Sequence, residues 1–536
     1  MEAPNAPLLH NGTYDKLNAV LGADVSTFIT TFSAWQALVL FLCLSWGISS
    51  VSTNRRVKVA GAPVHGYWSW FEPTWFFKMR YAKDAHKTIV SGYHKYKDSP
   101  FVLRRQDHDI TILPTKYVNE LRTIPNAKLS RGRANFLEWG DQWAMHTLWS
   151  HSEWPIKAIS ENRNGQMTKY LEAIRKELDY AYEVEMPQMD DWTEIDIQPV
   201  IRKLLVRIIG KMIVGNPACR SEEWLHLGDH FTEDFVAASI IMRLLPKWLH
   251  PFFTNIIPQR WRLRKGLKDT RAIVDPAVRR HEEAKKQRAQ GKEVDEEDSM
   301  LNWVIDNADK DQVLEALPQI VLVMFVPAAH TTAMAISNVL FDLCSHPEWA
   351  DKLHAEVADV TKEFGPVGEK LPVKDWTGKL EFLDSFFQES QRMSQPISIT
   401  PNRYAYEDVT FKDGLTIPKG ALVGFVAVHN QIDPEIAPNP EVFDPTRCLR
   451  KRHSAPEEKD KHLAGQPSKE NFAFGFGSQA CPGRNYAVAV LKMVLSRMLT
   501  DYEFKFKPGD AKPKKYHLME FIIPDPTATL MMRKRK

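Results

Sequence analysis

The sequence predicts a mainly α protein with small β-sheets (α+β), built as one large domain behind a single N-terminal transmembrane helix. Three observations predict this class: apolar residues recur at helical spacing over the long segments, one segment alternates like strands, and an uncharged apolar run lies near the amino end. We divide the 536 residues into a lumenal segment (1–26), a transmembrane anchor (27–52), a basic, Pro- and Gly-containing hinge (53–68) and a cytosolic domain (69–536).

The composition is that of a folded protein, with 43% hydrophobic and 26% charged residues. Lys and Arg number 70 against 67 Asp and Glu, so the net charge of +3 creates no global field and we expect no nucleic-acid partner. The five cysteines are scattered and never form a CxxC pair, which argues against a disulfide framework and a zinc module. A reduced compartment fits this usage.

The apolar run is the first element of the chain. Between Asp24 and Arg55 there are 30 residues without a charge, and "FSAWQALVLFLCLSWGISSV" (32–51) is long enough to cross a bilayer as a helix. A cleaved signal peptide and a buried core helix are the alternatives, and the missing basic region before the run disfavours the first. Basic residues after the run place the rest of the chain in the cytosol, which would make Asn11 a lumenal glycosylation acceptor.

The remaining elements follow in one large domain without an internal repeat. Two polar segments, 285–299 and 454–470, are expected to be solvated connections. The segment 408–429 alternates and turns like a short β-hairpin region. Helical spacing predicts long helices at 166–183, 199–213, 312–344 and 376–393.

Near the carboxyl end, "FAFGFGSQACPGRNYA" (472–487) places Cys481 directly before Pro482. A proline suits the first position of a helix, and the apolar spacing after it continues to about residue 499. The amino end of a helix stabilises negative charge, so a thiolate is favoured at the Cys481 sulfur. Glycines on both sides of the cysteine remove side chains, which lets a flat, bulky group lie against the backbone.

Several interpretations of this loop compete. "GFGSQA" (475–480) fits the GxGxxA pattern of a dinucleotide site, but no hydrophobic strand precedes it. A catalytic cysteine nucleophile would need a base that the sequence alone can neither supply nor exclude, and an inert buried cysteine is the commonest alternative. A haem iron ligated by the thiolate accounts for the phenylalanine, glycines, cysteine and arginine together.

These residues resemble the cytochrome P-450 family, whose FxxGxxxCxGxxxA signature is matched at every fixed position. The matching residues are Phe474, Gly477, Cys481, Gly483 and Ala487, with Arg484 extending the match. From about residue 60 onward the chain resembles fungal microsomal members of secondary metabolism. The resemblance implies a haem-thiolate monooxygenase fold in which Cys481 is the axial ligand of haem b and the other signature residues contact the haem.

Two motifs upstream occur in the order that the family requires. "FFQESQR" contains Glu389 and Arg392 in an ExxR arrangement, and "NPEVFDPTR" resembles the meander segment with Phe443, Pro445 and Arg447. An ExxR motif alone is weak, because Glu and Arg three residues apart form ordinary helix pairs. The resemblance implies that Glu389, Arg392 and Arg447 form a structural network beneath the haem.

The segment 321–343 resembles the long helix that crosses the distal face of the haem. Thr331 keeps the usual threonine, while His330 stands where an acid is usual. Pro327 removes the hydrogen bond to the Val323 carbonyl and is expected to kink the helix. A catalytic proton relay through Thr331 and His330 is implied, although a lone histidine on an apolar helix is more often a satisfied core residue.

Two departures affect the expected propionate contacts. Gln479 stands where the family usually has His or Arg, and no clear WxxxR occurs in the expected region, where Lys157 lies instead. Arg403 and Lys157 are the candidates for those contacts.

The resemblance implies an oxidoreductase that inserts one atom of O2 into a C–H or C=C bond. Electrons would reach it from NADPH only through a membrane-bound cytochrome reductase, with the basic run at 447–453 as a candidate docking segment. The expected substrate is a hydrophobic terpenoid, steroid or polyketide intermediate that contacts 324–328, 397–400 and 521–523. We expect a single-pass protein of the endoplasmic reticulum membrane. A reductase-independent isomerase or peroxygenase and a non-catalytic haem-binding membrane protein are the alternatives.

Overall fold

The structure is a computed structural model. It describes residues 36, 39–40, 43–44, 47, 56–69, 72–140, 143, 153–161, 166–245, 247–308 and 313–536. Asn11 and most of the expected transmembrane anchor lie outside the described residues. Within the described part, Leu314–Ser345 is long and apolar enough to cross a membrane, but 61% of its apolar window is buried inside the protein, as in a core helix.

The chain divides into two compact units. The first consists of residues 1–56 and 67–79, and the second of residues 57–66 and 80–536. In the first unit, the ring of Tyr67 stacks on Phe77 with centroids 4.6 Å apart. The second unit holds the sheets, the long helices and the cysteine loop.

The elements are as follows. The described helices are α4 (Thr74–Lys83), α5 (Ala85–Lys95), α6 (Val118–Leu121), α7 (Arg131–Glu138), α9 (Glu153–Glu161), α10 (Gln166–Glu185), α11 (Ile197–Val214), α12 (Glu222–Leu244), α13 (His250–Phe253), α14 (Pro258–Ala289), α15 (Met300–Asn307), α17 (Leu317–Ser345), α18 (Ala350–Phe364), α19 (Val373–Gly378), α20 (Glu381–Met393), α21 (His429–Ile432), α22 (Arg447–Arg452) and α23 (Arg484–Asp501). The described strands are β1 (Val64–His65), β2 (Phe101–Arg104), β3 (Asp109–Ile112), β4 (Leu129–Ser130), β5 (Thr193–Ile195), β6 (Ile399–Ala405), β7 (Val409–Thr410), β8 (Thr416–Ile417), β9 (Leu422–Val426), β10 (Tyr502–Lys505), β11 (Lys515–Leu518), β12 (Phe521–Pro524) and β13 (Leu530–Lys534).

The prediction of a mainly helical domain with small sheets is confirmed. Helices α10, α11 and α17 lie where spacing predicted them, with ends shifted by a few residues. Local capping explains some of these ends: the Asp196 carboxylate accepts a hydrogen bond from the Gln198 N–H at the start of α11, and Gly215 ends that helix with a φ of 70°.

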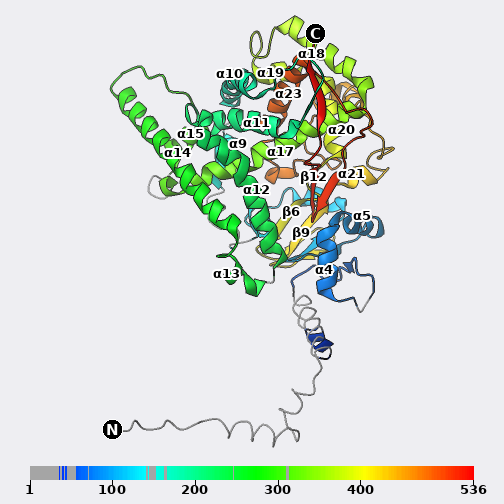
Figure 1. Ribbon diagram of the computed structural model, residues 1–536. Coiled ribbons are helices and arrows are strands. Elements are labelled where there is room, and N and C mark those ends of the chain that lie inside the picture. The colour runs from blue at the N-terminus through cyan, green and yellow to red at the C-terminus, as the bar shows by residue number, and fades with distance from the viewer. Residues whose placement is uncertain are drawn as a thin grey trace, which may run out of the picture. The chain divides into compact units, whose positions relative to one another are not determined.

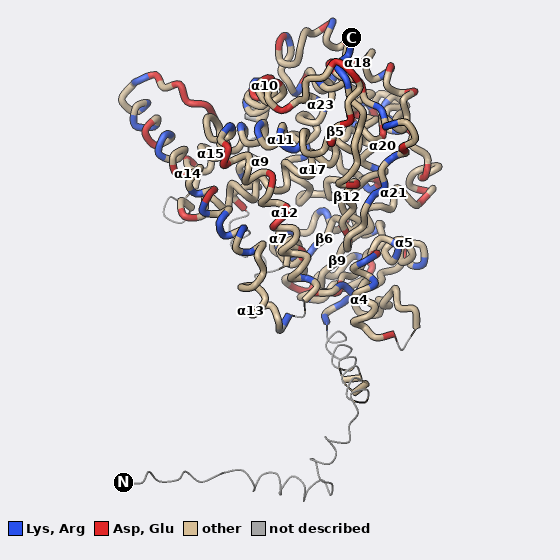
Figure 2. Tube along the Cα trace, viewed as in Figure 1, with Lys and Arg blue, Asp and Glu red and all other residues tan. Residues whose placement is uncertain are grey.

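Helix α17 lies in the largest hydrophobic core. It packs against α11, α12, α14, α20 and α23, and Figure 1 shows it among these helices. Most of its residues are apolar, as expected of a helix that is buried over most of its surface. Figure 2 accordingly shows almost no charge along α17, whereas α14 carries many charges of both signs.

The largest sheet has the strand order β1-β2-β3-β9-β6-β4. β2 and β3 are antiparallel, β3 and β9 are parallel, and β6 is antiparallel to both β9 and β4. A second hydrophobic core on this sheet includes Phe472 and Phe476, which lie on either side of Gly475 in the cysteine loop. The sheet therefore anchors the cysteine loop.

Three predicted segments differ from the structure. The predicted helix 376–393 is two helices, α19 and α20, separated at Lys379 and Leu380. Strands β7 and β8 form the expected hairpin, but β9 joins the large sheet instead. The first polar segment is partly helical, because α14 continues to Ala289 before the connection begins.

Candidate active site

The cysteine loop is a tight turn between the large sheet and α23. The Cys481 N–H donates to the Phe474 carbonyl at 2.8 Å, and the Gly475 N–H donates to the Phe472 carbonyl at the same distance. Gly475 and Gly477 have φ values of 74° and 75°, which L side chains rarely adopt. The loop therefore turns on its glycines and leaves Cys481 half-buried.

Two glycines of the signature differ in what they accommodate. A Cβ at Gly477 would lie 2.8 Å from the Arg122 Cα, so the protein's own backbone requires a glycine there. A Cβ at Gly483 would meet nothing within 4 Å, and its φ of −84° suits any residue. Protein packing therefore does not explain Gly483, whereas room for a bound group beside the cysteine does.

Helix α23 begins at Arg484, with Gly483 as its N-cap. Pro482 therefore precedes the N-cap, and the prediction that it occupies the first helical position is wrong by two residues. The Arg484 guanidinium donates to the Cys481 carbonyl at 2.8 Å, which ties the cysteine to the first turn of the helix. Ala487 lies half-buried on the same helix, and its N–H donates to the Gly483 carbonyl at 2.9 Å.

Thr331 and Pro327 occupy an accessible edge of α17. Both are exposed, although most of the helix around them is buried, so this edge faces open space rather than packed protein. The Thr331 hydroxyl donates to the Pro327 carbonyl at 2.6 Å. The helix is continuous through Pro327.

His330 lies against a different helix. Its Nε2 is 3.2 Å from the carbonyl oxygen of Gly228 on α12. Burial lowers the pKa of His330 to about 4, opposed by this hydrogen bond and reinforced by Arg202. The imidazole is therefore neutral at pH 7 and donates to Gly228, which favours a packing role over proton donation.

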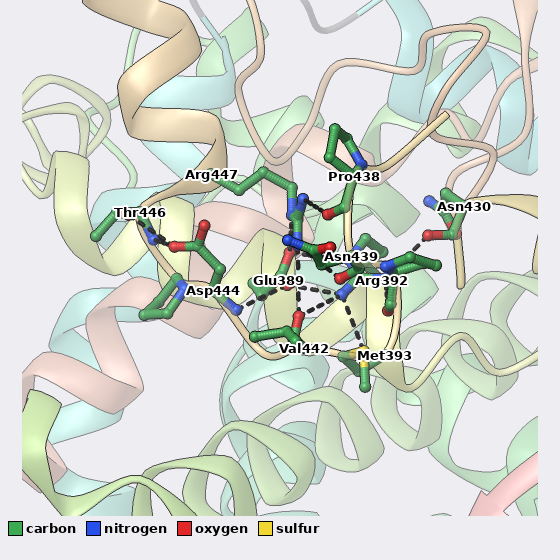
Figure 3. A network of polar contacts seen from close by, with 12 residues as sticks. Glu389, Arg392, Met393, Asn430, Pro438, Asn439, Val442, Asp444, Thr446 and Arg447 are labelled. Carbon is green, nitrogen blue, oxygen red and sulfur yellow. Dashed lines mark hydrogen bonds and ion pairs between the residues drawn. The ribbon is translucent and has the colours of Figure 1, made fainter. Parts of the chain in front are cut away.

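The ExxR pair lies in a buried network that Figure 3 shows. Arg392 donates to both oxygens of Glu389, from Nε at 2.9 Å and from a terminal nitrogen at 2.7 Å. Arg447 Nε reaches the same carboxylate at 3.3 Å, and the Asp444 N–H donates to it at 2.9 Å. The three residues named from the sequence thus meet, with Asp444 as an additional donor.

Backbone carbonyls satisfy the remaining donors of the two arginines. Arg392 donates to the carbonyls of Asn430 and Pro440 at 2.9 and 2.7 Å, and Arg447 donates to that of Pro438 at 2.7 Å. Such acceptors carry no side-chain signal, so the sequence could not reveal them. Phe443 stacks on His346 beside the network, with ring centroids 4.6 Å apart.

The basic run at 447–453 is engaged within the protein. Each of its basic residues has an acidic partner: Arg447 with Glu389, Arg450 with Asp444, Lys451 with Glu470, and Arg452 and His453 with Glu381. A cavity of about 560 Å³ lies beside this run and is also lined by residues of 461–471. The run therefore serves internal structure before any docking.

Two guanidinium groups, those of Arg131 and Arg403, lie on the sheet side of the loop. Arg403 is 1% exposed; within the part of the chain that the structure describes, it donates only to the carbonyls of Asn402 and Phe476, and its Nε has no partner. Burial, followed by the charge of Arg131, lowers the pKa of Arg403 to about 9. Neither arginine has a carboxylate partner among the described residues, so the pair is electrostatically suited to an anion.

Gln479, which stands where the family usually has His or Arg, holds Arg131 beside the cysteine loop. Its side-chain oxygen accepts from the Arg131 N–H at 2.8 Å, its carbonyl accepts from the Arg131 guanidinium at 2.6 Å, and its amide donates to the Leu129 carbonyl at 2.9 Å. Sequence reasoning missed Arg131, which lies 348 positions away from Gln479. Lys157 is exposed and lies over the Trp154 ring at 4.6 Å, so we favour Arg131 and Arg403 for the anion contacts.

These residues fit a haem: a thiol on a tight loop, room at Gly483, and two cations suited to propionates. Comparison with known proteins agrees. The sequence model of the Cytochrome P450 family matches residues 127–532. Cytochrome P450 monooxygenase sdnB of Sordaria araneosa is 64% identical over 541 residues, covering 100% of this chain and 99% of the relative.

More distant relatives cover most of the chain too. Cytochrome P450 monooxygenase ATR4 of Stachybotrys chlorohalonatus is 36% identical over 96% of this chain and 98% of its own. Ent-kaurene oxidase P450-4 of Gibberella fujikuroi is 31% identical over 94% of this chain and 96% of its own. The chain belongs to the cytochrome P450 family, so it is a haem-dependent oxidoreductase that uses O2 and receives electrons from a partner reductase.

Proposed function

We propose that this monooxygenase oxidises a hydrophobic terpenoid-type intermediate of fungal secondary metabolism. The observation that carries the substrate class is that apolar segments expected at the substrate converge in the fold. Ile397 and Phe521 pair as an isolated antiparallel bridge, and β12 packs beside α17, which holds 324–328. The relatives named as ent-kaurene oxidases support a diterpene hydrocarbon over a steroid or polyketide.

We assign the following roles to the site residues. Cys481 ligates the haem iron, and the bound haem supplies the activation of O2. Arg131 and Arg403 hold the propionates, while Glu389, Arg392 and Arg447 fix the segment beneath the cysteine loop. Thr331 hydrogen-bonds at the accessible edge of α17 and passes protons there, with His330 keeping that helix packed on α12.

We also propose the membrane arrangement that the amino-terminal sequence favours. The run at 27–52 anchors the chain in the endoplasmic reticulum membrane, with residues 1–26 in the lumen and the domain from 69 in the cytosol. The NADPH-dependent reductase then lies in the same membrane. Asn11 becomes available for glycosylation in this topology.

One experiment tests the proposed function. The chain is expressed in microsomes with a cytochrome reductase, the carbon monoxide difference spectrum is recorded, and ent-kaurene, a steroid and a polyketide are each supplied with NADPH. We expect a strongly red-shifted Soret band and oxygenated product from the diterpene only. Product that forms without NADPH would instead support the reductase-independent isomerase or peroxygenase, and the band without any turnover would support a non-catalytic haem protein.

A further inference from the structure

Three aromatic rings from distant parts of the chain lie in one group, which we call the aromatic stack. The ring centroid of Trp139 lies 5.1 Å from that of Phe521 and 5.3 Å from that of Phe235. Phe235 is buried, whereas Trp139 and Phe521 are half-buried. The stack is carried by the end of α7, by α12 and by β12, and the last two elements pack against α17, which holds Thr331.

A buried charge cluster joins the same elements. Its members are Arg105, Asp107, Glu138, Arg243 and Glu520. Arg105 lies 3.1 Å from the Glu138 carboxylate and 3.5 Å from that of Glu520. Arg243 lies 3.1 Å from the Asp107 carboxylate and 3.4 Å from that of Glu520. Two arginines thus face three carboxylates, and all five are buried or half-buried, so losing either arginine leaves buried carboxylates without enough compensation.

Each ring is linked closely to a member of the cluster. Glu138 directly precedes Trp139, and Glu520 directly precedes Phe521. Arg243 follows Phe235 by eight residues on α12, so both lie on one face of that helix. Between them, the Ser239 hydroxyl donates to the Trp139 carbonyl at 3.0 Å. The charges therefore fix the positions of all three rings.

Several contacts at Glu520 and the neighbouring hairpin tip hold the backbone that leads into Phe521. The tip of the β11–β12 hairpin is buried, and Met519 there has a φ of 52°, which L residues rarely adopt. The Met519 N–H donates to the Ala82 carbonyl at 3.1 Å, and the Tyr81 hydroxyl donates to the Glu520 carboxylate at 3.0 Å. Ser398 N–H donates to the Glu520 carbonyl at 2.8 Å. Phe521 leaves this anchored tip at once, so its ring has little freedom.

We infer that the aromatic stack selects the substrate by the shape of its hydrocarbon, and that the charge cluster positions the stack. The inference rests on the proposed function, because it names the surface that receives the apolar molecule. Half-buried aromatic faces held rigidly favour a fused polycyclic hydrocarbon over a flexible chain, which would lose more conformational entropy on binding.

Azole binding tests the stack without requiring turnover. The probes are clotrimazole, an imidazole bearing three aryl rings, and imidazole itself, each titrated against the full-length microsomal haem protein by difference spectroscopy. We expect Phe521→Leu and Trp139→Leu to weaken clotrimazole binding about fivefold and to leave imidazole binding unchanged. Unchanged clotrimazole affinity in both variants overturns the inference.

A double-mutant cycle tests the positioning role of the cluster. We expect Glu520→Gln to reproduce the loss seen in Phe521→Leu, and the double variant to lose no more than either single variant. Additive losses would mean that Glu520 acts elsewhere and would overturn the positioning role. Glu194→Gln, which removes an exposed ion pair with Lys507 on another sheet, is the matched control and should bind both azoles normally.

These experiments distinguish a folding defect from failure of the proposed function and from failure of the inference. If Glu520→Gln loses the red-shifted carbon monoxide band, Arg243→Lys, which keeps the charge, replaces it in the cycle. A wild-type protein without that band overturns the proposed function and the inference together. A wild-type protein with the band and tight azole binding, but with no effect of the stack variants, overturns the inference alone.

Discussion

Glu389 and Arg392 form a bidentate ion pair one helical turn apart on α20, with N–O distances of 2.9 and 2.7 Å and exposures of only 1% and 6%. Arg392→Ala leaves the buried carboxylate with too few cations, so we expect a loss of ~3–5 kcal/mol in the free energy of unfolding and no bound haem. Haem content per chain is the measurement. Arg175→Ala breaks a half-exposed pair of the same spacing on α10 and should cost ~0–1 kcal/mol. Normal haem content in Arg392→Ala would refute the network's role.

Cys481→Ala should abolish the red-shifted carbon monoxide band, because no other thiol lies on the loop. Cys344 is the control: it is a partly buried cysteine on α17, and burial raises its pKa to about 12, which keeps it a neutral thiol. Cys344→Ala should keep the band. The assignment fails if Cys481→Ala retains it.

Thr331→Ala removes the hydroxyl that donates to Pro327 at the accessible edge of α17. We expect NADPH consumption to continue while peroxide replaces product, because proton delivery to the reaction site is impaired. Peroxide released per NADPH oxidised is the measurement. Thr332→Val is the neighbouring control, since Thr332 is buried and faces the core. Unchanged coupling in Thr331→Ala would count against the relay.

Gln479→Ala removes two side-chain hydrogen bonds that hold Arg131 and Leu129 to the cysteine loop. We expect haem to leave about thirtyfold faster, since each of the two lost hydrogen bonds costs ~1 kcal/mol. Transfer of haem to an apo-globin acceptor measures this rate. Ser478→Ala, at an exposed neighbour with one long hydrogen bond of 3.4 Å, should leave the rate unchanged. An unaltered rate in Gln479→Ala would remove the positioning role.

Glu138 and Glu520 should respond oppositely to pH although both contact Arg105. Burial raises the pKa of Glu138 more than Arg105 lowers it. Burial also raises the pKa of Glu520, but Arg105 and Arg243 together lower it below its usual value. Stability from Glu138 is therefore present below its unfolded pKa and declines as the pH rises, whereas stability from Glu520 is present above its unfolded pKa and declines as the pH falls.

Glutamine variants separate the two groups. We expect Glu138→Gln to gain stability relative to the natural chain as the pH rises above 4.5, because glutamine resembles the protonated acid. Glu520→Gln should cost ~3 kcal/mol at pH 7 and progressively less below pH 4.5. Urea unfolding across this range measures both effects, and parallel pH profiles for the two variants would contradict the assignment.

The sequence predicted most of what depends on local pattern. The cysteine loop, the ExxR pair and α17 each lie within one contiguous stretch, so spacing and residue type sufficed. The break between α19 and α20 was not predicted, because apolar residues keep helical spacing on both sides of it. Pro482 lies outside α23 because a turn precedes Gly483, and a proline suits either position.

Groups assembled from distant segments could not be predicted. Arg131 reaches the cysteine loop only through Gln479, and no pattern around residue 131 signals a cofactor contact. The charge cluster joins four segments, the β2–β3 turn, α7, α12 and the β11–β12 hairpin, whose charged residues look individually like surface residues. Their burial depends on the packing of α7 and α12 with the sheet and hairpin, which single-sequence reasoning does not supply.

The wide separation of the charge cluster along the chain has a consequence for engineering chimeras with relatives. Glu138, Arg243 and Glu520 would come from different parents if crossover points fell between them, and a mismatched parent would leave a buried charge unpaired. A single-segment exchange of the β11–β12 hairpin or of α12 would therefore disturb folding and regiochemistry together. Transplanting substrate choice requires moving these segments as one block, with Arg105 and Asp107 included.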